Sequence, residues 1–70
     1  MNGNEFLKKV KKIGRKNGVE IIINSKQGKG SHVILHYGTR FTTLKDRRKE
    51  IGEGLLKAMC QHLGIKKTDL

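Results

Sequence analysis

Apolar residues in the first quarter of the chain follow the spacing of a helix. They recur at steps of one, three and four residues, which places them on one stripe of an α-helix. These residues are Phe6, Leu7, Val10 and Ile13. The pattern predicts a helix over residues 4–16, with Asn2 or Asn4 as its N-cap and Gly18 just beyond its end. Gly14 lies on the apolar stripe, where it either permits a close approach or marks fraying.

The middle of the chain alternates apolar and polar residues, as strands with one buried face do. Three strands are predicted, over residues 19–24, 31–37 and 40–44, joined by a polar turn and by a tight connection at 38–39. The face predicted to be buried carries Val19, Ile21 and Ile23, then Val33, Leu35 and Tyr37. The opposite face of the second strand carries His32, Ile34 and His36.

Helical spacing returns over residues 52–63. The apolar side of this second helix is predicted to contain Ile51, Leu55, Leu56, Met59, Cys60 and Leu63. The pair Gly64-Ile65 fits a helix stop in which a left-handed glycine is followed by an apolar residue. Residues 66–70 are expected to form a frayed tail.

The predicted order is helix, three antiparallel strands, helix. A three-stranded sheet that is apolar on one face needs a cover, and two amphipathic helices on that face supply it. The fold class is therefore α+β, with the α-β-β-β-α layout of a double-stranded-RNA-binding domain. Seventy residues correspond to a single domain, 1–70.

Charge narrows the list of partners. Sixteen Lys and Arg against six Asp and Glu give a net charge of +10, which a polyanion or an acidic protein would relieve. Nucleic acid is the first candidate partner and an acidic protein the second. No apolar run approaches the ~20 residues needed to span a bilayer, so no membrane partner is expected. The single cysteine favours a reducing cytoplasm.

One histidine stands out as a candidate for chemistry. The sequence holds no metal-ligand spacing, and no metal or cofactor is expected. His32 follows a basic turn that contains Lys26 and Lys29, and imidazole exchanges protons near neutral pH. RNA cleavage needs such a group, with cations on the phosphate, because the RNA supplies its own nucleophile. The alternative is a histidine that only packs on a sheet face. His36 is either a second proton carrier, a phosphate contact or a partly exposed strand residue.

Cations are concentrated in three segments that are candidates for binding phosphate. They are the polar face of the first helix, the turn before His32 and the loop after the third strand. The candidate residues are Lys8, Lys12, Arg15, Lys26, Lys29, Lys45, Arg47 and Arg48. Ser31 is a further candidate auxiliary residue. The alternative for the helix is a lysine-rich face that only contacts solvent.

Two elements of the sequence together resemble the HicA family of small bacterial toxins. The first is Lys29-Gly30-Ser31-His32 at the start of the second strand, and the second is the run from Ile51 to Ile65, which ends in Leu63-Gly64-Ile65. The resemblance covers nearly the whole chain. It implies a double-stranded-RNA-binding-like fold, a messenger-RNA-cleaving nuclease whose required residue is His32, and a HicB-type antitoxin as partner.

These observations lead to one principal hypothesis and two alternatives. The principal hypothesis is a toxin of a type II toxin-antitoxin system, an endoribonuclease that cleaves mRNA without a metal and is neutralised by an acidic HicB-type antitoxin. The first alternative is a non-catalytic RNA-binding module that recognises A-form RNA by shape. The second is a basic ribosome-associated or DNA-binding protein, although the chain has no clear helix-turn-helix.

Overall fold

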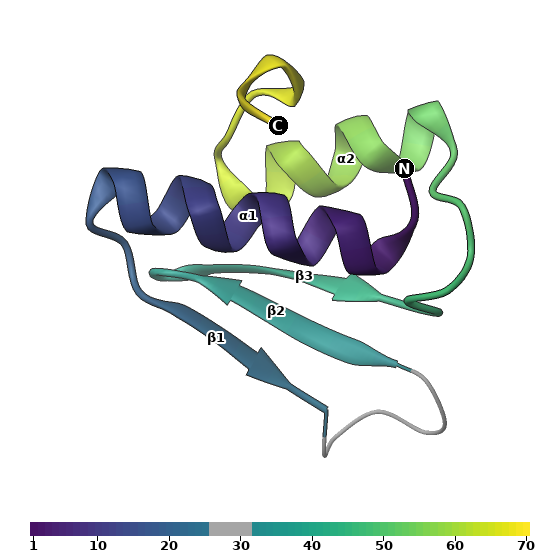
Figure 1. The fold of residues 1–70 in the computed structure, drawn as a ribbon, viewed down its shortest axis with the longest axis horizontal. Coiled ribbons are helices and arrows are strands. Elements are labelled where there is room, and N and C mark those ends of the chain that lie inside the picture. Colours follow the sequence, from purple (N-terminus) through teal and green to yellow (C-terminus); the bar gives the residue numbers. More distant parts are fainter. Residues whose placement is uncertain (26–31) are drawn as a thin grey trace.

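A computed structural model describes residues 1–25 and 32–70. The elements run in the order helix, three strands, helix and a short 3₁₀ turn (Figure 1). Their bounds are α1 Gly3–Asn17, β1 Ile21–Asn24, β2 Val33–Tyr37, β3 Arg40–Leu44, α2 Glu53–Leu63 and η1 Lys67–Asp69. Lys26, Lys29 and Ser31, three of the candidate site residues, lie outside the described residues.

The three strands form one antiparallel sheet in the order β1-β2-β3, and both helices lie on the same side of it (Figure 1). This arrangement confirms the α+β class and the predicted order. Gly38 and Thr39 alone connect β2 to β3, and Gly38 has φ 62°. A glycine with positive φ at the first central position of a two-residue loop is typical of a type II′ hairpin. Thr39, which follows it, keeps an ordinary negative φ.

The core lies between the sheet and the helices. Phe6 and Val10 of α1, Leu35 of β2 and Met59 of α2 are almost wholly removed from solvent. The predicted buried face of β2 is confirmed, because Val33 and Leu35 are buried while Ile34 and His36, on the other face, are only half-buried. The prediction for Leu55 is wrong. The sequence pattern places it on the apolar side of the second helix, yet its side chain is 53% exposed.

The ends of α1 settle both alternatives left open by the sequence. Asn2 is the N-cap: its side chain accepts a hydrogen bond from the Glu5 N–H at 2.9 Å, and the Glu5 carboxylate accepts one from the Asn2 N–H. Gly14 is a close-approach position, since a Cβ there would lie 2.6 Å from the Ile21 side chain. Gly18 ends the helix with φ 68°.

The end of α2 has the hydrogen bonds of a Schellman motif. Gly64 adopts φ 74°, its N–H donates to the Gln61 carbonyl, and the Ile65 N–H donates to the Cys60 carbonyl. The chain beyond it is not a frayed tail, which corrects the expectation for 66–70. Lys67 pairs with Glu53 of α2 and Leu70 packs against the core, so an ion pair and an apolar contact hold η1 in place.

Candidate functional site

His32 is exposed and directly precedes β2. The last pair in the β2–β3 register is Val33 with Leu44. His32, just before β2, and Lys45, just after β3, are the next residues beyond this pair. Because Val33 is buried, alternation turns the His32 side chain away from the core, where it borders a groove. The imidazole is therefore accessible to a large substrate and lies where β3 passes into the basic loop.

A groove of about 490 Å³ connects His32 to that loop and to α2. Its polar wall combines the imidazole with two lysine side chains and two carboxylates, while its floor is apolar. The lining residues are His32, Thr43, Leu44, Lys45, Asp46, Lys49, Glu50, Ile51, Leu55 and Met59. An imidazole beside two ammonium groups can exchange a proton while the cations hold an anionic substrate.

Backbone hydrogen bonds to the start of the chain fix the loop that forms this wall. The Asn4 N–H donates to the Arg47 carbonyl at 2.9 Å, and the Ile51 N–H donates to the Met1 carbonyl at 2.8 Å. Gly3 sits against the loop so closely that a Cβ there would lie 2.6 Å from the Arg47 Cα. The loop from 45 to 51, called the basic loop below, is thus held against the first turn of α1 (Figure 1).

Asp46 shapes the turn inside the basic loop. Its carboxylate accepts a hydrogen bond from the Arg48 N–H at 3.0 Å, and the Arg48 guanidinium lies 3.7 Å away. The backbone hydrogen bond from Arg48, helped by the cations of Arg48 and Lys49, holds the pKa of Asp46 below its ordinary value. Asp46 is therefore ionised at neutral pH, which suits a hydrogen-bond acceptor and not a proton donor.

His36 lies too far from His32 to share one phosphate with it. Four residues along an extended chain span about 13 Å at ~3.3 Å per residue. His36 is paired with Phe41 in the β2–β3 register, and the two rings lie 6.0 Å apart in a tilted arrangement. Of the roles considered for His36, this geometry favours a substrate contact on the open sheet face over a second proton carrier.

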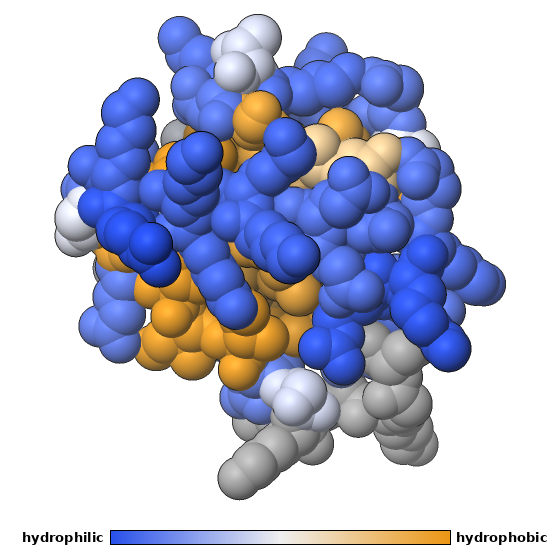
Figure 2. Space-filling view, viewed as in Figure 1, coloured by the Kyte–Doolittle hydropathy of each residue, from blue (hydrophilic) through white to orange (hydrophobic). Residues whose placement is uncertain are grey.

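The candidate cations of α1 form a separate surface. Lys8, Lys12 and Arg15 are exposed and lie at three- and four-residue spacing, so they follow one line along the helix. Figure 2 shows hydrophilic side chains over the outer face of α1, with an apolar area just below the helix on the side of β1. Lys12 also borders a hollow beside η1, where Asp69 brings negative charge near it.

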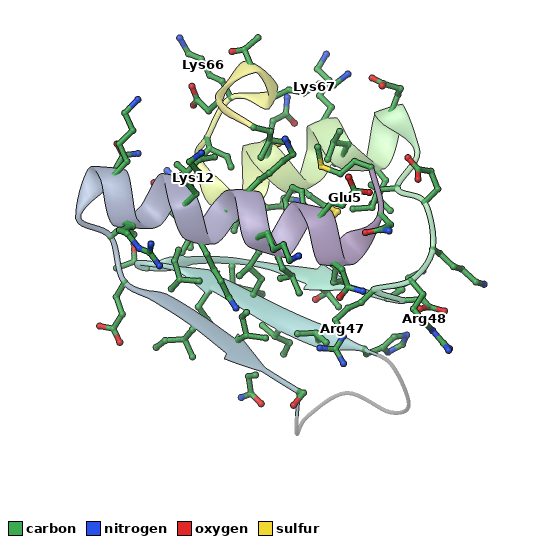
Figure 3. All side chains as sticks on the ribbon, viewed as in Figure 1. Glu5, Lys12, Arg47, Arg48, Lys66 and Lys67 are labelled. Atoms are coloured by element: carbon green, nitrogen blue, oxygen red, sulfur yellow. The ribbon has the colours of Figure 1, made fainter. Side chains whose placement is uncertain are left out.

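Arg47 and Arg48 lie at the end of the sheet where β2 begins, whereas Lys12 lies farther along α1 (Figure 3). The structure thus brings Lys45 into the groove with His32, places Arg47 and Arg48 in the same basic loop, and keeps the α1 cations as a second surface. The two basic surfaces meet at the first turn of α1, where the Asn4 N–H bonds to the basic loop.

Sequence reasoning missed Lys49 and Leu55 as lining residues of the groove. Lys49 was not singled out within a run of charges, and its position depends on the contacts of the basic loop with the N-terminus. Leu55 carried a usable signal. At about 100° per residue it lies on the flank of the stripe formed by Leu56, Cys60 and Leu63, next to Met59.

Two other reactive side chains are occupied by structural roles. Cys60 is buried, and burial raises the pKa of its thiol, so the thiolate needed for nucleophilic attack is disfavoured. His62 Nδ1 lies 3.2 Å from the Oγ1 of buried Thr42, in hydrogen-bond contact. Within residues 1–25 and 32–70, no three His, Cys, Asp or Glu side chains form a group that could hold a metal ion.

The fold and the groove together define a small α+β protein with a basic site around an exposed histidine. The family model for the HicA toxin of bacterial toxin-antitoxin systems matches residues 7–65. The chain therefore belongs to the HicA toxin family, and an antitoxin is its partner. Comparison with curated proteins and with solved structures gives no significant match. None of the helices described here is long and apolar enough to cross a membrane.

Proposed function

We propose that this toxin is a metal-independent endoribonuclease that cleaves mRNA in the cytoplasm and so inhibits translation. The observation that carries the proposal is the exposed His32 in a groove with Lys45 and Lys49. The side chains of this groove can exchange protons and bind an anion, which are the two requirements of RNA cleavage. Membership in the HicA toxin family supports the same conclusion.

The reaction uses the 2′-hydroxyl of the RNA as nucleophile. A base removes its proton, the oxygen attacks the adjacent phosphorus, and the bond to the 5′-oxygen of the next nucleotide breaks as that oxygen gains a proton. His32 serves as general base or general acid, a role worth typically 10²–10⁴-fold in rate. Lys45 and Lys49 stabilise the charge that develops on the phosphate. This route needs no metal ion because the nucleophile belongs to the substrate.

Substrate binding is distributed over the basic surfaces. Arg47 and Arg48, with Lys45, bind phosphates next to the cleaved bond, while Lys8, Lys12 and Arg15 of α1 bind phosphates farther along the strand. Lys26, Lys29 and Ser31, which precede His32 in the sequence, are assigned to the same substrate on sequence grounds alone. Binding through phosphates is independent of base sequence.

The partner is a HicB-type antitoxin, and we propose that it is acidic and covers His32 directly. A charge of +10 on seventy residues attracts an acidic protein and raises its association rate. Covering the histidine stops cleavage even of RNA that is weakly bound. The His32 ring signals in NMR spectra of the free toxin and of the complex test this: they should shift on binding, and an unchanged His32 pKa and exposure would contradict direct cover.

The nuclease proposal is tested with His32→Ala and compared with His36→Ala, which should weaken RNA binding as a lost substrate contact but leave cleavage at saturating RNA unchanged. Each variant is expressed from an inducible promoter in a bacterium, and growth and RNA integrity are followed. His32→Ala should lose growth arrest and cleavage, about 10²-fold or more, while the fold and RNA binding persist. Purified wild type should cleave in buffer that contains a chelator.

Two results would contradict the proposal in different ways. Equal cleavage by His32→Ala and wild type would reject His32 as the catalytic group, and loss of wild-type activity in chelator would reject the metal-independent route. Intact RNA recovered from a tight complex with wild type would instead support a non-catalytic RNA-binding module.

A further inference from the structure

The outer edge of the sheet at β3 borders a long groove. The groove that contains His32 shares Thr43, Leu55 and Met59 with a second cavity of about 630 Å³. The second cavity extends from Thr43 back along β3 to Thr39 and along α2 to His62. The two cavities are therefore adjacent and together border the whole of β3; the pair is called the β3 groove below.

The wall of the β3 groove contains backbone groups that have no strand beside them. β3 pairs with β2 and is the last strand in the order, so no strand of residues 1–25 or 32–70 lies along its other edge. The two-residue hairpin closes on Tyr37 and Arg40, and hydrogen bonding alternates along an antiparallel pair. Arg40, Thr42 and Leu44 therefore bond to β2, and the N–H and C=O groups of Phe41 and Thr43 point outward into the groove.

The floor of the β3 groove is apolar and its two ends are basic. Leu55 is 53% exposed and Phe41 is 59% exposed, which is unusual for large apolar side chains in a domain with so small a core. Arg40 lies at one end, and Lys45 and Lys49 lie at the other. Asp46 and Glu50 also line that second end, but Asp46 is paired with Arg48 and Glu50 with the N-terminal amine. A free strand edge beside an apolar floor is the kind of surface to which an extended peptide adds as a further strand.

We propose that the β3 groove binds an extended, acidic segment of a protein partner, which adds to the sheet as a fourth strand beside β3. Apolar side chains of this segment rest on Leu55 and Met59, and its carboxylates pair with Arg40 at one end and with Lys45 and Lys49 at the other. Because the His32 end of the groove lies within its path, the added strand also closes the site. The choice of the antitoxin as its source rests on the proposed function.

Charge distinguishes this occupant from the others. A second copy of the chain would bring another +10 and place Arg40 and Lys45 against like charges, which opposes pairing. RNA would match the cations, but it lacks the regular repeat of N–H and C=O groups with which a strand edge pairs. An acidic peptide strand can pair its carboxylates with the cations, bond its backbone to the outward N–H and C=O groups, and rest apolar side chains on Leu55.

The test uses a synthetic ten-residue peptide of alternating valine and glutamate and a control peptide of the same composition with its valines and glutamates in two blocks. Affinities are measured by fluorescence anisotropy for wild type, Thr43→Pro and Thr43→Val. Of the backbone hydrogen-bonding groups of β3, proline removes only the outward N–H of residue 43, because this N–H does not bond to β2, and valine retains it. The alternating peptide should bind wild type and Thr43→Val at least tenfold more tightly than the block peptide, and Thr43→Pro should lose that preference.

A second measurement keeps the test decisive if Thr43→Pro fails to fold. Hydrogen exchange of wild type with saturating alternating peptide should slow at the Phe41 and Thr43 amides by at least 100-fold. The Ile21 and Ile23 amides, on the other edge of the sheet, should be unchanged. Leu55→Gln should weaken the peptide severalfold, and Leu55→Met should retain it.

Three results would overturn the proposal. They are equal affinity for the two peptides, unchanged exchange at Phe41 and Thr43, and loss of RNA binding instead of peptide binding in Thr43→Pro. Each of these is independent of the cleavage assay with His32→Ala, so failure of the strand-addition proposal is distinguishable from failure of the nuclease proposal.

Discussion

The basic loop and the outer face of α1 both carry clusters of cations, yet the structure holds them in different ways. The basic loop is fixed by hydrogen bonds to Met1 and Asn4 and borders His32. On α1, Lys8 and Arg15 stand on a solvent-exposed helix face. Cations fixed beside a proton carrier can act on the transition state, whereas exposed cations along a helix contribute mainly to phosphate binding. The comparison shows that charge alone does not locate a catalytic site.

The strongest test of this comparison removes the two groove lysines. Lys45→Ala combined with Lys49→Ala should lower the cleavage rate at saturating RNA by about 10²-fold, because cations aimed at the developing charge are lost. Single-turnover cleavage measures it. The matched control is Lys57→Ala with Lys66→Ala, which removes two exposed cations from α2 and the segment after it. A similar loss in the control would show that total charge, and not position, sets the rate.

The α1 surface should affect binding and leave the chemical step alone. Neutralising Lys8, Lys12 and Arg15 to Gln should reduce the slope of log K against log salt by roughly 0.7 for each lost phosphate contact on single-stranded RNA. Cleavage at saturating RNA should keep its wild-type rate. A salt titration of RNA affinity measures the slope, and an unchanged slope would show that this face contacts only solvent.

Gly3 holds the basic loop against α1, and its replacement tests that contact. Gly3→Ala should destabilise the fold by about 1–3 kcal/mol, since a Cβ would overlap the Arg47 backbone and must displace the loop. The control is Gly54→Ala, also in the first turn of a helix, where a Cβ meets nothing within 4 Å. Gly54→Ala should stabilise by roughly 0.5–1 kcal/mol. Urea unfolding distinguishes the two, and equal effects would contradict the close packing at Gly3.

The smallest expected effect concerns the start of α1. Asn2→Ala removes the side chain that accepts from the Glu5 N–H and should cost about 1 kcal/mol of unfolding free energy. Asn4 is the second residue of the helix. Asn4→Ala should cause no measurable loss of unfolding free energy, because alanine is the better helix former. Thermal unfolding of both variants provides the measurement. A larger loss from Asn4→Ala would identify Asn4 as the cap.

Much of the fold could be predicted from the sequence because its signals are local. The periodicity of Phe6, Val10 and Ile13 indicated the buried side of α1, and the apolar residues at every second position from Val33 to Tyr37 indicated which face of β2 is buried. The third strand was predicted with the bounds that the structure has, 40–44. His32 could be singled out for the same reason: in the sequence it follows a stretch rich in lysine and glycine and precedes an apolar run, and both features belong to neighbouring residues.

What only the tertiary structure decided depends on residues far apart in the chain. The groove exists because the loop after β3 is bonded to Met1 and Asn4, more than forty residues away, and no local pattern encodes that contact. Leu55 belongs to the floor of the groove because α2 packs with Leu56 and Leu63 inward, which leaves the flank of its apolar stripe exposed beside β3. The chain after Gly64 folds back against the domain because Lys67 pairs with Glu53 and Leu70 packs against the core. Periodicity specifies which side of an element is apolar, and the packing of distant elements determines how much of that side remains open to a partner.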